Sequence, residues 1–258
     1  MKQKIKQLLC LLLACQLFTG TAWARPDWPA DTGIQAEAGI VMDADSGAIL
    51  FGQNIHVPSP PASITKILTA LIVLEHAQPD EMVTFTETAC NSVESDSGNK
   101  LGVVPGDTLT VEDCLYGLLL VSANQAANAL AEHVAGSIPA FVDMMNDKLA
   151  ELGCTESHFD NPSGLNGDTQ YVTAYDMALI AQAAYQNETL LEISSVKNHK
   201  LAPTINYPGG LTVNQEHRLL KEGDDFYYSP AKAGKTGYLQ AAGNTLVTYA
   251  EKDGRRLI

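Results

Sequence analysis

The stretch that decides the fold is Pro61-Ala62-Ser63-Ile64-Thr65-Lys66-Ile67-Leu68-Thr69, which continues as ALIVLEHA to residue 77. Its apolar residues recur at helical spacing, and prolines break the chain just before it, so the pattern predicts a largely buried helix that begins at Ser63. Ser63 and Lys66 lie three positions apart at the start of this helix, where both side chains emerge on one face. An amine in that position can serve as base for a hydroxyl, provided that the amine is neutral.

The Ser-x-x-Lys spacing alone is a weak indication, because it occurs four times, beginning at Ser63, Ser97, Ser194 and Ser229. Context favours Ser63, which is mounted on a buried helix, whereas the others lie in a polar loop, in a short segment before a chain break, or next to a proline. Ser63 could also be a simple helix N-cap followed by a solvent-facing lysine. Further motifs are needed to decide.

Two such motifs follow in order. Ser122-Ala123-Asn124 comes directly after an apolar helix end, and Lys235-Thr236-Gly237 lies on a predicted strand. Each has an ordinary explanation, since Ser122 or Asn124 could cap the next helix and Lys235 could be an edge-strand charge that opposes aggregation. The ordered set Ser-x-x-Lys, Ser-x-Asn, Lys-Thr-Gly is, however, the pattern of a serine acyl-transfer site. We therefore interpret the three motifs as one site with Ser63 as its nucleophile.

The surrounding chain predicts a mixed α/β (α+β) fold. Two apolar-rich runs around a turn at 43–47 predict a β-hairpin over 38–53, and strands are predicted over 233–240 and 244–251. Between them the chain is dominated by helices over 110–186, with a capping box at Thr110 and Asp113 opening a helix to Leu120. Helices over 124–135 and 138–152 are separated by Gly136. The sheet is thus expected to be assembled from both ends of the chain.

The first two dozen residues differ in composition from the rest of the chain. Three lysines precede the apolar run 8–18, and Ala22-Trp23-Ala24 supplies a cleavage site, so residues 1–24 are predicted to be a signal peptide of an exported protein. A retained membrane anchor is disfavoured because the apolar run is well short of the ~20 residues that span a bilayer. A lipoprotein processing site at Cys15 is the less favoured alternative to a cleaved signal peptide. Residues 25–37 form a polar leader, and 38–258 the catalytic domain, which looks incomplete at its C-terminus.

Composition excludes several classes of function. Loss of the signal peptide removes three lysines and no acidic residue, which takes the formal charge from −14 to −17 and argues against nucleic acid or an anionic membrane surface as partner. The remaining cysteines, Cys90, Cys114 and Cys154, form no metal-binding cluster and allow at most one disulfide, so the fold is expected to rest on its core. No zinc-peptidase motif and no nucleophile elbow of a Ser-His-Asp hydrolase is present.

The three motifs and their flanks, including Ala233-Gly234-Lys235-Thr236-Gly237-Tyr238, resemble the low-molecular-mass penicillin-binding proteins that act as serine D-alanyl-D-alanine carboxypeptidases. The resemblance runs from about residue 38 to 258, and includes Asn161-Pro162-Ser163-Gly164-Leu165 and Thr173-Ala174-Tyr175-Asp176. It implies an antiparallel sheet flanked by helices, with an inserted all-helical subdomain. No cofactor and no metal are implied. The implied partners are peptidoglycan stem peptides ending in D-Ala-D-Ala and β-lactam antibiotics.

The resemblance also implies a role for each residue. Lys66 would be the base for Ser63, Lys235 a second cation that helps to lower the Lys66 pKa, and Ser122 a proton relay to the leaving amine. Backbone N–H groups of Ser63 and Tyr238 would form the oxyanion hole. The remaining residues implied to bind substrate are Asn124, Lys235, Thr236, Gly237 and, loosely, Arg256. In this family a β-rich domain and an amphipathic anchor often follow the catalytic domain, which leaves membrane attachment open.

Two other functions fit the same fold. A β-lactamase shares the three motifs but deacylates the drug quickly with a glutamate between the second and third, and no Glu-x-x-x-Asn occurs between Asn124 and Lys235. A catalytically silent wall-binding module would retain the fold, but intact motifs argue against it. The sequence therefore favours a carboxypeptidase.

Overall fold

The computed structural model of the chain describes residues 33–92, 101–165 and 167–258. The predicted signal peptide, the leader up to residue 32 and Ser97 lie outside these residues. Residues Glu37–Ile258 form one compact unit. No helix within the described residues is long and apolar enough to cross a membrane.

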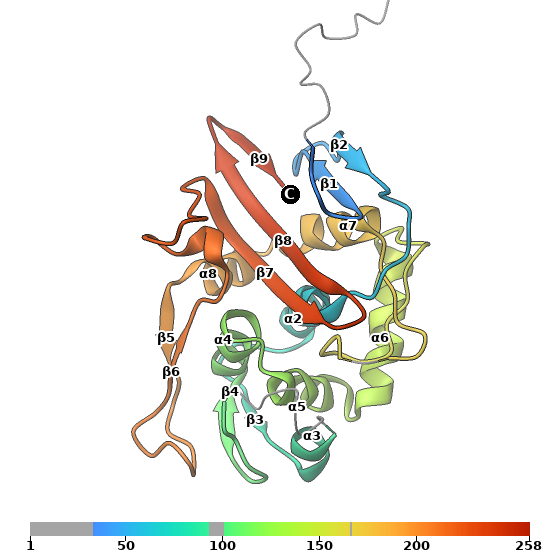
Figure 1. The fold of residues 1–258 in the computed structure, drawn as a ribbon. Helices are drawn as coiled ribbons and strands as arrows, with labels where there is room; N and C mark the ends of the chain where they lie inside the picture. The colour runs from blue at the N-terminus through green and yellow to red at the C-terminus, as the bar shows by residue number, and fades with distance from the viewer. Residues whose placement is uncertain (1–32, 93–100, 166) are drawn as a thin grey trace, which may run out of the picture. The chain divides into compact units, whose positions relative to one another are not determined.

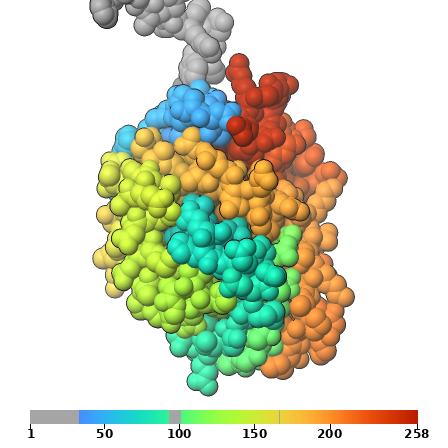
Figure 2. Space-filling model, turned by 180° about the vertical axis from the view of Figure 1, so that it is seen from behind, coloured from blue at the N-terminus to red at the C-terminus, as the bar shows by residue number. Residues whose placement is uncertain are grey.

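Strands from opposite ends of the chain lie side by side. β1 (Gly39–Met42) and β2 (Ile49–Gln53) form the predicted hairpin, while β7 (Ala231–Leu239), β8 (Gly243–Lys252) and β9 (Arg255–Leu257) form an antiparallel sheet in that order. The backbones of Met42 and Ile258 exchange hydrogen bonds of 2.8 and 2.9 Å, which joins β1 to the C-terminal strand (Figures 1 and 2). The predicted assembly of the sheet from both ends is confirmed.

Three helices lie on one side of this sheet (Figure 1). The predicted helix is α2 (Lys66–His76), which is largely buried as expected but begins at Lys66 rather than Ser63, because Ser63 lies in a preceding 3₁₀ turn, η1 (Ala62–Thr65). α7 (Ala174–Ala184) packs against β1 and β8, and α8 (Glu188–Ser195) packs against β7. η1 itself packs against β7 and β8, so the start of the central helix meets the sheet directly.

The inserted helical part contains α3 (Glu87–Asn91), α4 (Val111–Leu120), α5 (Asn124–Ala135) and α6 (Ile138–Glu151). Thr110 caps α4 as predicted, its Oγ1 accepting a 3.0 Å hydrogen bond from Asp113 N. The capping box is not completed, because the Asp113 carboxylate instead accepts from His199 Nε2 at 2.8 Å and from Ala202 N at 2.9 Å. α5 has the predicted bounds and ends at Gly136, whose φ of 76° is left-handed.

Two small antiparallel strand pairs were not predicted. β3 (Met82–Thr84) pairs with β4 (Thr108–Thr110), and β5 (Asn198–Lys200) pairs with β6 (Thr212–Asn214). Each strand has three residues, which is too short to show a two-residue alternation in the sequence. The inserted part is therefore dominated by helices rather than entirely helical.

The buried residues of α2 belong to the hydrophobic core, and no disulfide joins the cysteines that the structure describes. Phe85, Phe141 and Phe159 are fully buried in the same core. Cys90, Cys114 and Cys154 are buried free thiols. Burial raises the pKa of Cys154 to about 12, so its thiol is un-ionised at neutral pH.

Candidate active site

Ser63 and Lys66 form the first contact of the site. Lys66 Nζ donates a 3.0 Å hydrogen bond to Ser63 Oγ and another to the backbone carbonyl of Ser163. Lys66 is 0% exposed, so it is not a solvent-facing lysine. Ser63 is not an N-cap either, because the helical turn is capped by Pro61 without a side-chain bond. The ordinary explanation of this motif fails on both residues.

Two other Ser-x-x-Lys pairs can be compared with this one, since the pair that begins at Ser97 lies outside the described residues. Lys197 is mostly exposed and forms an ion pair with Glu222 at 2.9 Å, rather than with Ser194. Lys232 Nζ donates to the backbone oxygen of Ser229, at 3.5 Å, rather than to its hydroxyl. Among the three pairs within the described residues, only Ser63 and Lys66 join hydroxyl and amine by a hydrogen bond.

Ser122 and Asn124 lie at the junction of α4 and α5. The N-cap of α5 is Ala123 and no side chain caps it, so neither residue has the capping role that was the alternative interpretation. Asn124 is buried at the start of α5, which packs against α2. Ser122 has a φ of 62°, a left-handed conformation that costs about 1 to 3 kcal/mol for a residue with a side chain. Strain of this kind is often concentrated at functional sites.

Lys235, Thr236 and Gly237 lie on β7, which is an edge of the three-stranded sheet. Lys235 is 1% exposed and its Nζ donates to the Thr236 carbonyl at 2.6 Å, so it is not an exposed edge charge. A Cβ built on Gly237 would lie 2.8 Å from the backbone nitrogen of Ser63. Only glycine therefore lets β7 approach the start of the helix this closely.

The segment before Ser63 is also fixed to the sheet. Thr245 Oγ1, on β8 opposite Gly237, donates a 3.0 Å hydrogen bond to the carbonyl of Pro61. Ala62 has a φ of 52° and is fully buried. Two of the four described non-glycine residues with positive φ, Ala62 and Ser122, thus belong to the site.

Tyr238 and Arg256 remain to be placed. Tyr238 follows Gly237 on β7 and is 67% exposed. Arg256 pairs with Glu251 on β8, six positions from Thr245, which corresponds to about 20 Å along a strand. Its guanidinium forms an ion pair with Asp45. The structure does not bring Arg256 together with Ser63, and we leave it out of the site.

His217 lies beside the site and was not singled out in the sequence. A Cβ on Gly234 would lie 2.6 Å from its ring, and its Nε2 contacts Thr248 Oγ1 at 2.9 Å and the Val247 carbonyl at 3.3 Å. The ring is 1% exposed. Burial, together with the nearby positive charge of Lys235, lowers the pKa of His217. Because these contacts join residues distant in the chain, a lone histidine in the sequence gives no sign of them.

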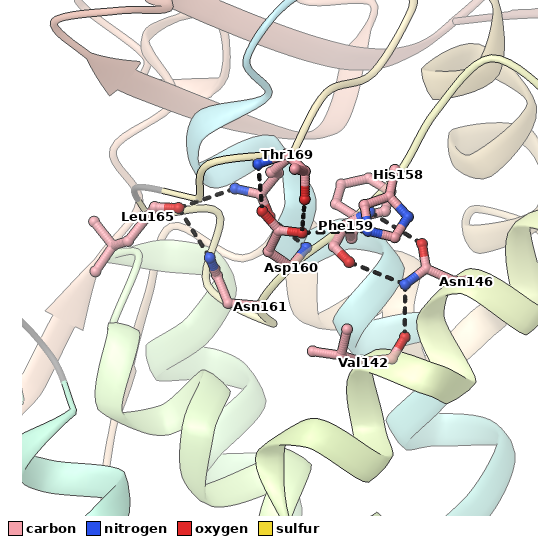
Figure 3. A network of polar contacts seen from close by, with 9 residues as sticks. Val142, Asn146, His158, Phe159, Asp160, Asn161, Leu165 and Thr169 are labelled. Atoms are coloured by element: carbon pink, nitrogen blue, oxygen red, sulfur yellow. Dashed lines mark hydrogen bonds and ion pairs between the residues drawn. The ribbon is translucent and has the colours of Figure 1, made fainter.

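The loop that supplies the Ser163 carbonyl is itself tightly bonded (Figure 3). Asn161 Nδ2 donates to the Leu165 carbonyl at 2.9 Å. Asn146 of α6 exchanges hydrogen bonds of 2.9 and 3.1 Å with the backbone of Phe159 at the start of the loop.

Among the described residues, no three His, Cys, Asp or Glu side chains lie close enough together to hold a metal ion.

The chain is similar to known proteins along most of its length. A family model described as D-alanyl-D-alanine carboxypeptidase matches residues 25–258. The chain is 38% identical to D-alanyl-D-alanine carboxypeptidase DacB2 of Mycobacterium tuberculosis over 243 residues, which cover 90% of this chain and 74% of DacB2. It is 30% identical to DacF of Bacillus subtilis over 260 residues, covering 98% of this chain and 65% of DacF.

Solved structures agree with the sequence comparisons. A D-alanyl-D-alanine carboxypeptidase from M. tuberculosis superimposes with a TM-score of 0.77 at 37% identity, covering 86% of this chain and 80% of that one. A mutant of a Streptomyces DD-transpeptidase superimposes with a TM-score of 0.80 at 28% identity, covering 88% and 90%. The predicted fold class is confirmed. The chain belongs to the D-alanyl-D-alanine carboxypeptidase family of peptidases.

Proposed function

We propose that this chain removes the terminal D-alanine of peptidoglycan stem peptides through an acyl-enzyme on Ser63. The observation that carries the proposal is the hydrogen bond of 3.0 Å between Lys66 Nζ and Ser63 Oγ, made by an amine that is 0% exposed. Burial disfavours the charged form of an amine, and a neutral amine can accept the hydroxyl proton.

The first half of the reaction forms an ester. Ser63 Oγ gives its proton to Lys66 Nζ and attacks the carbonyl carbon of the penultimate D-alanine. The backbone N–H groups of Ser63 and Tyr238 donate to the oxyanion, a contribution of about 3 kcal/mol in comparable sites. The carbon–nitrogen bond then breaks, and the leaving amine of D-alanine takes a proton that Ser122 relays from Lys66.

The second half releases the enzyme. Water attacks the ester carbonyl carbon and gives a proton to the base, Lys66 Nζ. The bond between that carbon and Ser63 Oγ then breaks, and Ser63 Oγ takes up a proton. The products are the shortened stem peptide and free D-alanine. The first half-reaction returns Lys66 to its starting protonation state and leaves Ser63 as an ester, and the second restores the Ser63 hydroxyl, so the full cycle balances without a cofactor.

Substrate binding uses the open edge of β7. An extended peptide can add to this edge as a further strand, because Gly237 carries no side chain to obstruct it. Lys235 and Thr236 would hold the terminal carboxylate, and Asn124 would hydrogen-bond the substrate backbone. A β-lactam antibiotic has a carboxylate and a reactive carbonyl, so we propose that it acylates Ser63 in the same way.

The proposed substrate is found outside the cytoplasm, and the predicted signal peptide at residues 1–24 supports export. A fusion of residues 1–36 to a reporter that is active only after export tests this part of the proposal. Export is expected to be lost when the apolar run 8–18 is interrupted by charged residues. A fusion that is exported equally well with the interrupted run would exclude the signal peptide.

The activity is tested by incubating the protein with diacetyl-Lys-D-Ala-D-Ala and measuring free D-alanine. Wild-type protein is expected to release D-alanine, and Ser63→Ala to lose the release by several orders of magnitude. Thr155→Ala, which changes an exposed loop residue, serves as the matched control. Equal release by Ser63→Ala and wild type would exclude the proposal.

Two related fates of the acyl-enzyme are distinguished by other substrates. Rapid hydrolysis of nitrocefin would indicate a β-lactamase, whereas slow turnover of a fluorescent penicillin supports the carboxypeptidase. The likeness to a Streptomyces DD-transpeptidase makes transfer to an amine the second fate to examine. Adding glycine or a D-amino acid as acceptor would then yield a new peptide in place of the hydrolysed one.

A further inference from the structure

The side chain of Asn161 makes four hydrogen bonds within the turn 161–165, which Gln170 Nε2 also contacts by donating to the Leu165 carbonyl at 2.9 Å. Asn161 Oδ1 accepts hydrogen bonds from Gly164 N at 2.8 Å, from Ser163 N at 3.2 Å and from Ser163 Oγ at 3.0 Å. Its Nδ2 donates to the Leu165 carbonyl at 2.9 Å (Figure 3). The amide thus makes four of the bonds that define the turn, with both its acceptor and its donor in use.

This turn touches the start of α2 at three points. The Ser163 carbonyl accepts from Lys66 Nζ, and the Pro162 carbonyl accepts from Thr69 Oγ1 at 2.7 Å. Gly164, with a φ of 78°, lies so close that an added Cβ would be 2.7 Å from Thr65 Oγ1. A displacement of the turn would therefore move the hydrogen-bond acceptor of Lys66.

The two ends of the loop are held independently of Asn161. Asn146 binds both backbone groups of Phe159, and the Asp160 carboxylate accepts from Thr169 N at 2.9 Å and from Thr169 Oγ1 at 2.7 Å (Figure 3). Loss of the Asn161 amide should therefore loosen the tip of the loop without releasing the loop from the protein.

We propose that Asn161 is a positioning residue for acyl transfer, whose amide fixes the Ser163 carbonyl so that this carbonyl holds the Lys66 amine beside Ser63. The inference rests on the proposed function of Ser63 and Lys66. It adds a residue that lies outside the three motifs and that acts only through the backbone of its neighbour.

The arrangement also predicts how protonation of Lys66 responds to substitution. A carbonyl that accepts from an amine stabilises the ammonium form more than the neutral form, because the carbonyl oxygen is partly negative. Asn161→Ala frees the carbonyl and so lowers the pKa of Lys66. Asn161→Asp keeps an acceptor for the turn but adds a negative charge, which raises the pKa of Lys66. Both variants leave unchanged the charged and titratable groups of the surrounding elements, which include Lys235, His217, Asp160, His158 and the buried Asp176 of α7.

The experiment measures the second-order rate of acylation by a fluorescent penicillin as a function of pH. In Asn161→Ala the maximal rate is expected to fall by about tenfold or more, since loss of orientation is costly, and the acid limb is expected to move to lower pH. In Asn161→Asp the acid limb is expected to move to higher pH. A role in folding alone would not shift the two variants in opposite directions.

Thr169→Val is the matched control, because it removes a hydrogen bond of the same loop at its held end. Its acid limb is expected to coincide with that of the wild type. The inference is overturned if the acid limbs of both Asn161 variants also coincide with the wild type, whatever their rates. If Asn161→Ala does not fold, the direction in which the acid limb of Asn161→Asp moves decides the test. Failure of wild-type protein to be acylated at Ser63 would instead refute the proposed function.

Discussion

At the scale of single residues, the site depends on how closely backbones approach one another. Gly237 lies against the Ser63 nitrogen, Gly234 lies against the ring of His217, and Gly164 lies against the turn that precedes α2. At each position a Cβ would come within 3.0 Å of a neighbouring atom, so the neighbour would have to shift. The motif in the sequence requires Gly237, but it does not say which atom that glycine makes room for.

Gly237→Ala is therefore expected to impair acylation. The new Cβ would displace the Ser63 N–H, which we propose donates to the oxyanion, and loss of such a donor typically reduces the rate by about 10²-fold. The measurement is the rate of penicillin acylation. Gly209→Ala is the matched control, because no atom lies within 4 Å of a Cβ built there. A Gly237→Ala protein that is acylated as fast as the control would refute the close approach.

His217 gives a prediction about stability. Its pKa is lowered by burial and by Lys235, so below the usual value of about 6.5 the unfolded chain binds a proton that the folded chain does not. The free energy of unfolding should consequently fall as the pH drops below about 6.5. In His217→Gln this decrease should be smaller. The check is to measure the free energy of unfolding of both proteins in urea from about pH 7 to pH 5. An equal decrease in both proteins would contradict the prediction.

At the scale of elements, the sequence predicts most of what local signals determine. The hairpin over 38–53 is marked by its turn, α5 by Gly136, and α4 by Thr110. The start of the central helix could not be predicted in detail, because η1 owes its position to contacts with β7 and β8, which come from the far end of the chain.

The N-cap of α4 offers a test at this scale. Thr110→Ala removes the hydrogen bond to Asp113 N, which is expected to cost about 1 kcal/mol and to lower Tm by about 2 to 4 °C in a domain of this size. Penicillin acylation should be unchanged, because Thr110 lies at the opposite end of α4 from Ser122. Thr155→Ala should leave Tm unchanged. An equal decrease of Tm in this control would mean that loss of the N-cap hydrogen bond does not explain the effect of Thr110→Ala.

At the scale of the whole molecule, the site is formed where distant parts of the chain meet. Ser63 comes from η1 before the central helix, Ser122 and Asn124 from the helical part, and Lys235 from the C-terminal sheet. The ordered motifs predict that these residues meet. The contacts of the Ser163 carbonyl and of His217 could not be predicted in the same way, since each joins residues that are tens of positions apart in the chain.

The absence of disulfides among the described residues gives a prediction at this scale. Because Cys90, Cys114 and Cys154 are free and buried, dithiothreitol should leave Tm unchanged. Alkylation followed by peptide mapping should modify these three thiols only after unfolding. A disulfide between two of them would instead lower Tm on reduction, since such a bond typically contributes about 2 to 5 kcal/mol.

The central claim, that Ser63 is the nucleophile, is tested most directly by mapping the penicillin adduct. Protein incubated with penicillin is digested, and the modified peptide is identified by mass spectrometry. One adduct is predicted on the peptide that contains Ser63, and none is predicted in Ser63→Ala. An adduct that persists in Ser63→Ala, or that maps to Ser97, Ser194 or Ser229, would contradict the claim.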